Sequence, residues 1–188
     1  FGGDPVNMID IDEACFKLQS QDRNKGKVTK MRRCDARGMY KKGAESLSLL
    51  HAICGDSVNP FSFPRMYSEG GTTLHRFYFY MSDLISWLNI NRPGQSFCFT
   101  MDNLNIHKHQ IILDLIDDAG HRVLFRALYW SCDRAIEYVF NTIHTKLQMD
   151  DVGVTDINDL MTKIDDIIFE IDAVGYEAYF LHVGFGDM

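Results

Sequence analysis

The distribution of apolar and polar residues predicts strands early in the chain and an alternation of strands and helices further on. Segment 6–16 has the dense apolar character of a buried strand, with acidic residues near its carboxyl end. Segment 46–54 is expected to form a second strand, and segment 55–64 a turn-rich connection. Thr73 is suited to cap a helix, because the apolar residues after it recur at helical spacing. These residues are Phe77, Tyr80, Met81, Leu84, Ile85 and Leu88.

The second half of the chain repeats a unit of strand, turn and helix. Segment 96–102 is a short apolar run that predicts a strand, and the helix expected after it ends at Gly120. Segment 122–128 predicts a further strand, followed by helices over 134–147 and from about 155 to 171. Early strands followed by alternating strands and helices indicate an α/β fold with a mixed sheet.

The length of 188 residues, 46% of them hydrophobic, fits one globular domain. We expect residues 1–150 to form the core and residues 151–188 an acidic helix and tail packed on it. No apolar stretch approaches the roughly 18 to 20 residues of a membrane-spanning helix, and the first residues lack the features of a signal peptide. We therefore expect an intracellular protein with no membrane partner. Because the chain does not begin with Met, we expect further residues before Phe1.

Charge is distributed unevenly along the chain. The net charge of −7, taken as an average, argues against a nucleic-acid partner, because phosphate neutralisation requires Lys and Arg. Segment 22–42, however, holds nine of the nineteen basic residues against two acids, which leaves −14 for the rest of the chain. Such a basic segment is either a solvated loop or a phosphate-binding surface. From residue 150 onward there are ten acids and one lysine, so we do not expect this part to face DNA.

Acidic residues stand at the ends of two predicted strands. Functional residues of open α/β sheets gather outside the carboxyl ends of strands, where Asp12 and Asp102 are expected, and Glu137 can join them from a neighbouring helix. Three carboxylates repel one another unless a divalent cation offsets their charge, and oxygen ligands favour Mg²⁺ or Mn²⁺. Two such ions can activate a nucleophile and stabilise the leaving oxygen in a phosphodiester displacement. Spacing alone does not decide this, because the chain has 26 acids.

A second aspartate lies close to the first of these carboxylates. Period two places Asp10 and Asp12 on one face of their strand and Glu13 on the other. Asp10 is therefore either a supporting residue of the metal site or a strand acid bonded to nearby backbone.

Several short motifs occur in a distinctive order and spacing. They are Ile9-Asp-Ile-Asp-Glu-Ala-Cys-Phe16, Glu69-Gly-Gly-Thr-Thr73, Met101-Asp-Asn-Leu-Asn-Ile-His-Lys108, Ala119-Gly-His-Arg-Val-Leu-Phe125 and Ala135-Ile-Glu-Tyr-Val-Phe-Asn141. Thirty-four residues separate Asp102 from Glu137. Over roughly residues 6 to 148, this pattern resembles the catalytic core of mariner-like transposases in the DDE superfamily.

The resemblance implies a fold, a site and a set of partners. The fold would be ribonuclease H-like, a mixed sheet flanked by helices. Asp12, Asp102 and Glu137 match the catalytic residues that hold two Mg²⁺ or Mn²⁺ ions, and Asn103 matches a supporting position. The partner would be DNA, at transposon ends and at the target, with a second copy of the chain as a candidate, and the location nuclear in a eukaryote. The residues expected to contact DNA are Arg23, Lys25, Lys27, Lys30, Arg32, Arg33, His107 and Lys108.

One stretch departs from the family pattern and leaves two hypotheses open. Where the family usually has Pro-Pro-Tyr-Ser-Pro-Asp-Leu-Asn-Pro-Ile-Glu, the chain reads Ala127-Leu-Tyr-Trp-Ser-Cys-Asp-Arg-Ala-Ile-Glu137, without the prolines that stiffen the loop. The first hypothesis is a metal-dependent transposase domain that cleaves DNA and transfers the freed 3′-hydroxyl to the target. The second is a domesticated, non-catalytic descendant that serves as a scaffold or binding subunit of a larger complex.

Overall fold

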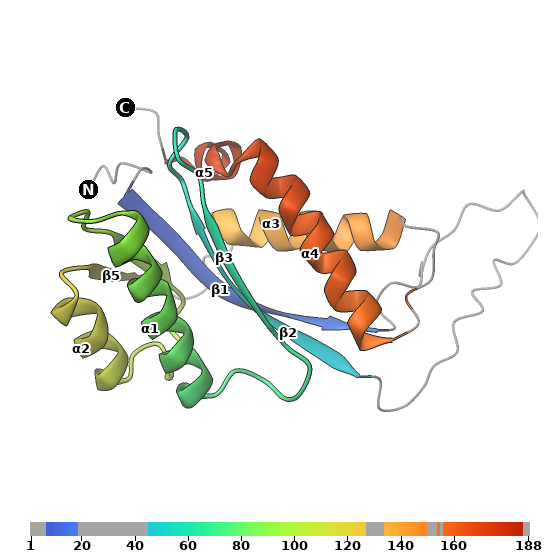
Figure 1. Cartoon of the computed structure of the whole chain (residues 1–188), viewed down its shortest axis with the longest axis horizontal. Helices are drawn as coiled ribbons and strands as arrows, with labels where there is room; N and C mark the ends of the chain where they lie inside the picture. Colours follow the sequence, from blue (N-terminus) through green and yellow to red (C-terminus); the bar gives the residue numbers. More distant parts are fainter. Residues whose placement is uncertain (1–6, 19–44, 127–133, 150–153, 155, 186–188) are drawn as a thin grey trace, which may run out of the picture.

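The computed structural model describes residues 7–18, 45–126, 134–149, 154 and 156–185 (Figure 1). Within these residues, five strands form one sheet in the order β3-β2-β1-β4-β5. β1 pairs antiparallel with β2, and β2 antiparallel with β3, whereas β1 pairs parallel with β4, and β4 parallel with β5. The sheet is therefore mixed, as the sequence predicts. The strands are β1 (Met8–Lys17), β2 (Ser46–Cys54), β3 (Ser62–Tyr67), β4 (Cys98–Met101) and β5 (Arg122–Phe125).

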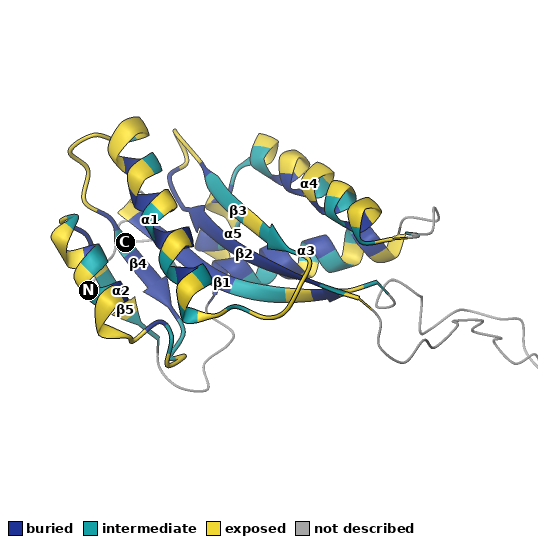
Figure 2. Cartoon of the chain, turned by 60° about the horizontal axis from the view of Figure 1, so that its bottom comes forward, coloured by how far each residue is buried: buried dark blue, intermediate teal, exposed yellow. Residues whose placement is uncertain are grey.

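Helices cover both faces of this sheet (Figure 1). One face carries α1 (Leu74–Asn91) and α2 (Gln110–Asp118). The other face carries α3 (Ala135–Met149), α4 (Ile157–Val174) and α5 (Glu177–His182). The sheet is thus the middle of three layers, and Figure 2 shows its central strands as buried. Among the described helices, none is long and apolar enough to cross a membrane.

The alternation of side chains along β1 divides its residues between the two layers of helices. Ile9 and Ile11 point into the apolar cluster with α1 and α2. Asp10 and Asp12 point to the opposite face, where Asp10 accepts a hydrogen bond from the backbone N–H of Ile136 in α3. The prediction that the two aspartates share a face is confirmed, and their face is the one covered by α3.

The periodic elements form close to where the sequence predicts them. β2 covers the predicted segment, and Thr73 caps α1 by accepting a hydrogen bond from the backbone N–H of Arg76. The six apolar residues predicted for the inner side of α1 are its buried residues. The helix α4 begins at Ile157 and packs its apolar side against the sheet beside α3.

Two elements differ from the prediction. The turn-rich connection and the residues after it contain β3, an edge strand in which Pro64 lies opposite His51. Proline has no N–H to donate, so it argues against a strand in the sequence, but it is tolerated at the edge of a sheet. β3 forms here because it pairs with β2. The aromatic tail forms the short helix α5, whose Phe180 packs into the cluster with α3 and α4.

Candidate active site

The register between β1 and β4 places two aspartates level with each other. Asp10 lies opposite Thr100 in the parallel pair, and β4 ends one residue after Thr100. Two residues further along, Asp12 follows Asp10 in β1 and Asp102 follows Thr100. Both aspartates therefore lie at the level just past the end of β4. Asp12 is in the middle of its own strand and not near its end, because β1 continues to Lys17 through its antiparallel pairing with β2.

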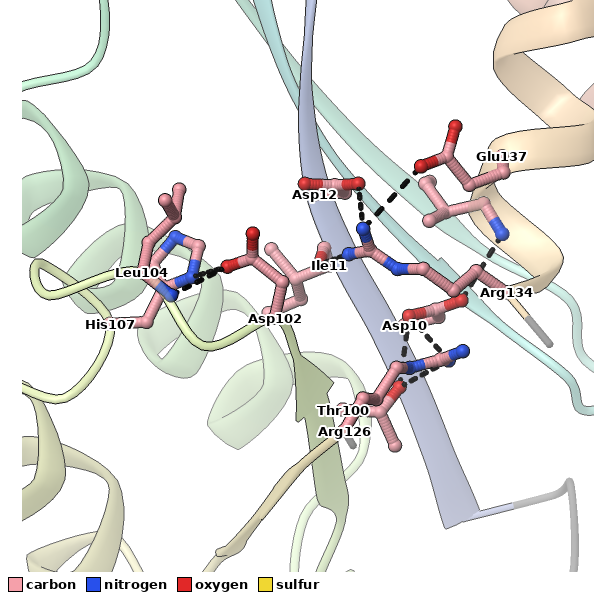
Figure 3. Close-up of polar contacts among 11 residues, drawn as sticks. Asp10, Ile11, Asp12, Thr100, Asp102, Leu104, His107, Arg126, Arg134 and Glu137 are labelled. Carbon is pink, nitrogen blue, oxygen red and sulfur yellow. Dashed lines mark hydrogen bonds and ion pairs between the residues drawn. The ribbon is translucent and has the colours of Figure 1, made fainter. Parts of the chain in front are cut away.

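Helix α3 brings Glu137 to the same end of β4. The N–H of Ile136 donates to Asp10 Oδ2 at 3.1 Å, which ties the first turn of α3 to β1. This bond is favourable in itself, because the N–H groups at a helix N-terminus lack partners within the helix and attract anions. Glu137 lies in that first turn, and Figure 3 shows its carboxylate on the same side as Asp12.

Asp12 is the most buried of the three carboxylates. Only 6% of its surface is exposed, whereas the side chains of Asp102 and Glu137 are 33% and 45% exposed. Burial is the main cause that raises the pKa of Asp12 to about 7; the carboxylates of Glu137 and Asp102 act in the same direction, and the Arg134 guanidinium acts against them. Asp12 is thus close enough to Glu137 and to Asp102 for their charges to affect it.

Arg134 joins two of these carboxylates through one guanidinium group. Its Nη1 atom lies 2.5 Å from Asp12 Oδ2 and 3.5 Å from Glu137 Oε1 (Figure 3). Its Nη2 atom donates to the carbonyl of Ile11 at 3.4 Å. Arg134 is not among the site residues that the sequence predicts. The sequence could have indicated it, because the mariner-like stretch quoted above usually has a neutral Asn at the position of Arg134.

His107 holds Asp102 in place on the other side of the site. The Nδ1 atom of His107 lies 2.6 Å from Asp102 Oδ1, which also accepts the N–H of Leu104 at 3.1 Å. The imidazole is buried and packs on Phe77, with 4.4 Å between the ring centroids. The sequence places His107 among the residues expected to contact DNA, whereas this geometry suits orientation of Asp102.

The supporting residues expected around the site make local contacts. Asn103 donates from Nδ2 to the carbonyl of Arg126, which links the loop after β4 to the end of β5. The Lys108 ammonium lies over the ring of Phe125, 5.7 Å from its centroid. The six basic residues expected to contact DNA, Arg23, Lys25, Lys27, Lys30, Arg32 and Arg33, lie outside the described residues.

Asp10 joins three elements and has no exposed surface. Its carboxylate lies 2.8 Å from Arg126 Nη2 and accepts the hydroxyl of Thr100 at 2.9 Å and the N–H of Ile136. Burial raises the pKa of Asp10, against the effect of the Arg126 guanidinium and of these hydrogen bonds. Asp10 is therefore placed to connect β1, β4 and α3. The carboxylates partly exposed to solvent at this end of the sheet are those of Asp102 and Glu137.

The carboxylates of the site suit a hard metal cation, but two of them are already paired with the guanidinium of Arg134. Carboxylate oxygens are the ligands that Mg²⁺ and Mn²⁺ prefer. Among the residues that the structure describes, however, no group of three or more His, Cys, Asp or Glu side chains is placed to hold a metal ion. The guanidinium of Arg134 lies between Asp12 and Glu137 and contacts both carboxylates (Figure 3).

Comparison with solved structures shows what this fold is similar to. No protein-family model matches the sequence, and no curated protein matches it either. The Mos1 mariner paired-end complex with Mg has a TM-score of 0.78 at 16% identity, over 95% of this chain and 52% of that chain. The Mos1 strand transfer complex gives 0.76 at 16% identity, over 95% and 52%. The catalytic domain of Mos1 mariner transposase gives 0.64 at 14% identity, over 95% and 76%.

The chain spans about half the length of the transposase chains in those complexes. The match extends over 95% of this chain, whose described residues form a mixed sheet between two layers of helices. The resemblance to mariner-like transposases therefore extends from the motifs to the tertiary structure, and the chain has the ribonuclease H-like α/β fold of the Mos1 transposase catalytic domain.

Proposed function

We propose that this chain is the catalytic domain of a DNA transposase that cleaves a DNA strand and transfers the freed 3′-hydroxyl, with Mg²⁺ or Mn²⁺ as cofactor. The observation that carries the proposal is the approach of Asp12, Asp102 and Glu137 from three separate elements in a Mos1-like fold. Mos1 structures have been solved with Mn and with Mg, which supports divalent metal use.

Each of the three acids would contribute carboxylate oxygens to the metal. When bound, the metal supplies the charge that activates a water or 3′-hydroxyl and stabilises the leaving oxygen of a phosphodiester. The protein contributes rigid placement of these ligands. Asp12 is held by the pairing of β1 with strands on both sides, and Glu137 by the anchoring of α3 on Asp10.

Asp102 lies in the loop after β4, so its position depends on contacts from neighbouring residues of that loop. His107 and the N–H of Leu104 both contact its Oδ1 atom. Groups that orient a ligand in this way fix which oxygen faces the metal. We infer that His107 sets the orientation of Asp102, and that Phe77 keeps the imidazole in place.

The test compares wild-type protein with Asp102→Asn in a nicking assay on supercoiled plasmid with Mn²⁺. Asp117→Asn, the same exchange at an exposed position of α2, is the control. We expect nicking by the wild type and by the control, and none by Asp102→Asn, while circular dichroism shows the same fold in all three. Nicking retained by Asp102→Asn would refute the proposed catalytic role.

A second candidate function is the domesticated scaffold, and one observation favours it. The ion pairs of Arg134 with Asp12 and Glu137 satisfy two of the acids without any metal. A protein that has lost catalysis gains stability from such a contact. Calorimetry with Mn²⁺ distinguishes the two functions, since a scaffold of this kind would bind no metal at these acids even when Arg134 is replaced.

A further inference from the structure

A cation of the protein itself takes part in the carboxylate site. Arg134 is 7% exposed, and its guanidinium contacts a carboxylate from β1, a carboxylate from α3 and the carbonyl of Ile11. Planar guanidinium groups suit such multiple contacts with carboxylates. The guanidinium of Arg134 therefore supplies the positive charge between Asp12 and Glu137.

We propose that Arg134 is an intramolecular counter-cation that competes with the divalent metal, so that metal binds only when the guanidinium leaves Asp12 and Glu137. The inference rests on the proposed function, because it takes these acids to be metal ligands. It adds a resting state of the site in which Arg134 neutralises two of the ligands, Asp12 and Glu137.

The charges explain why such a resting state forms. Asp12, Asp102 and Glu137 approach one another, and like charges at short range in a partly buried site repel strongly. Arg126, the other arginine nearby, lies 2.8 Å from the fully buried Asp10 and is engaged there. Among the described residues, Arg134 is consequently the arginine whose guanidinium contacts both Asp12 and Glu137.

The backbone around Arg134 allows its side chain to move without loss of the helix. The carbonyl of Arg134 accepts the N–H of Glu137 at 3.2 Å, and α3 is anchored on Asp10 through Ile136. Both bonds are independent of the Arg134 side chain. Glu137 can therefore keep its place when the guanidinium swings away, which is what a displaceable counter-cation requires.

The inference predicts how replacement of Arg134 changes metal binding. If a guanidinium must be displaced first, the apparent affinity for metal is reduced by the fraction of molecules in which it is bound. Arg134→Gln removes this competition, and we expect Mn²⁺ to bind about tenfold more tightly or more, a common size for coupling between two sites. A ligand-orienting role for Arg134 predicts the opposite sign.

The experiment is calorimetric titration of Mn²⁺ into wild type, Arg134→Gln and Arg65→Gln. The control removes an arginine that is also paired with an aspartate, Asp83, at 2.9 Å, but on the surface and away from the site. Thermal unfolding with and without Mn²⁺ gives a second readout. We expect Arg134→Gln to melt at a lower temperature than wild type without metal, and to gain more from Mn²⁺ than wild type does.

The outcomes separate this inference from the proposed function. Equal or weaker binding by Arg134→Gln, with clear binding by wild type, overturns the counter-cation and leaves the metal site standing. Absence of binding in wild type and in Arg134→Gln overturns both. If Arg134→Gln does not fold, Arg134→Lys keeps the charge but loses the double contact, and an affinity no higher than that of wild type overturns the inference.

Discussion

Replacement of His51 by phenylalanine should make the free energy of unfolding less dependent on pH, because it removes a titratable group from the core. His51 lies in β2 with no exposed surface, and its ring centroid is 6.3 Å from that of Phe140 and 6.4 Å from that of Tyr176. Neither ring nitrogen has a hydrogen-bond partner among the described residues. Burial in this apolar surrounding lowers the pKa of His51 to about 3.

The sign and size of the effect follow from the difference between the folded and unfolded protein. Between about pH 6.5 and pH 3, unfolded His51 binds a proton that the folded protein does not bind, so the free energy of unfolding falls as the pH falls through this range. From pH 8 to pH 5, the pKa difference corresponds to a loss of about 2 kcal/mol.

Urea denaturation of wild type and His51→Phe at pH 8 and pH 5 measures this loss. Wild type should lose about 2 kcal/mol more than the variant between the two pH values. The packing change caused by the larger ring is the same at both pH values, and Asp12, which lies opposite His51 in β1, is present in both proteins. His75→Phe at an exposed position of α1 tests whether the exchange itself creates a pH dependence. An equal loss in wild type and His51→Phe would refute the reasoning, because it would mean that folded His51 accepts its proton.

Further predictions concern the metal site and the structure that supports it. Because burial raises the pKa of Asp12 to about 7, protons compete with metal near and below that value, and the calorimetric affinity for Mn²⁺ should fall about fivefold from pH 7 to pH 6; a flat profile would contradict this. Asp156→Ala removes the side chain that caps α4 and should lower the free energy of unfolding by about 1 kcal/mol in urea, whereas no change would argue against the cap. Tyr80→Phe removes a hydroxyl that donates to the carbonyl of Phe63 at 2.6 Å and should lose about 1 kcal/mol in the same assay. Ile164→Ala opens a cavity in the core below α4 and should lose about 2 to 5 kcal/mol, and a loss below 1 kcal/mol would show that the site collapses around the smaller side chain.

Much of the fold is readable from local patterns. The inner side of α1 and the cap at Thr73 follow from helical spacing and a hydroxyl that accepts a backbone N–H, both of which act within a few residues. The common face of Asp10 and Asp12 follows from the two-residue period of a strand. The contact between Asp102 and His107 spans five residues of one loop, so the motif that contains them already brings them near each other.

The elements that the sequence did not reveal depend on long-range pairing. β3 contains Pro64 and has no strong apolar alternation, and it becomes a strand because β2 offers it hydrogen-bond partners. The sequence predicts the first strand over 6–16 but places Asp12 near its end, whereas pairing with β2 continues β1 past Asp12 to Lys17. Propensity within a short window cannot supply these partners, because they come from another part of the chain.

The sequence by itself determined the types of most elements and the mixed α/β class, since each of these follows from periodicity or from residues close in the chain. The family resemblance, and not the periodicity, selected the carboxylates of Asp12, Asp102 and Glu137. The tertiary structure decided what surrounds those carboxylates. Arg134 reaches Asp12 and the carbonyl of Ile11 across more than a hundred residues, and His51 is left among aromatic rings without a hydrogen-bond partner among the described residues. Such pairings and burials are set by how the layers pack, and packing is a property of the assembled sheet and helices rather than of any segment.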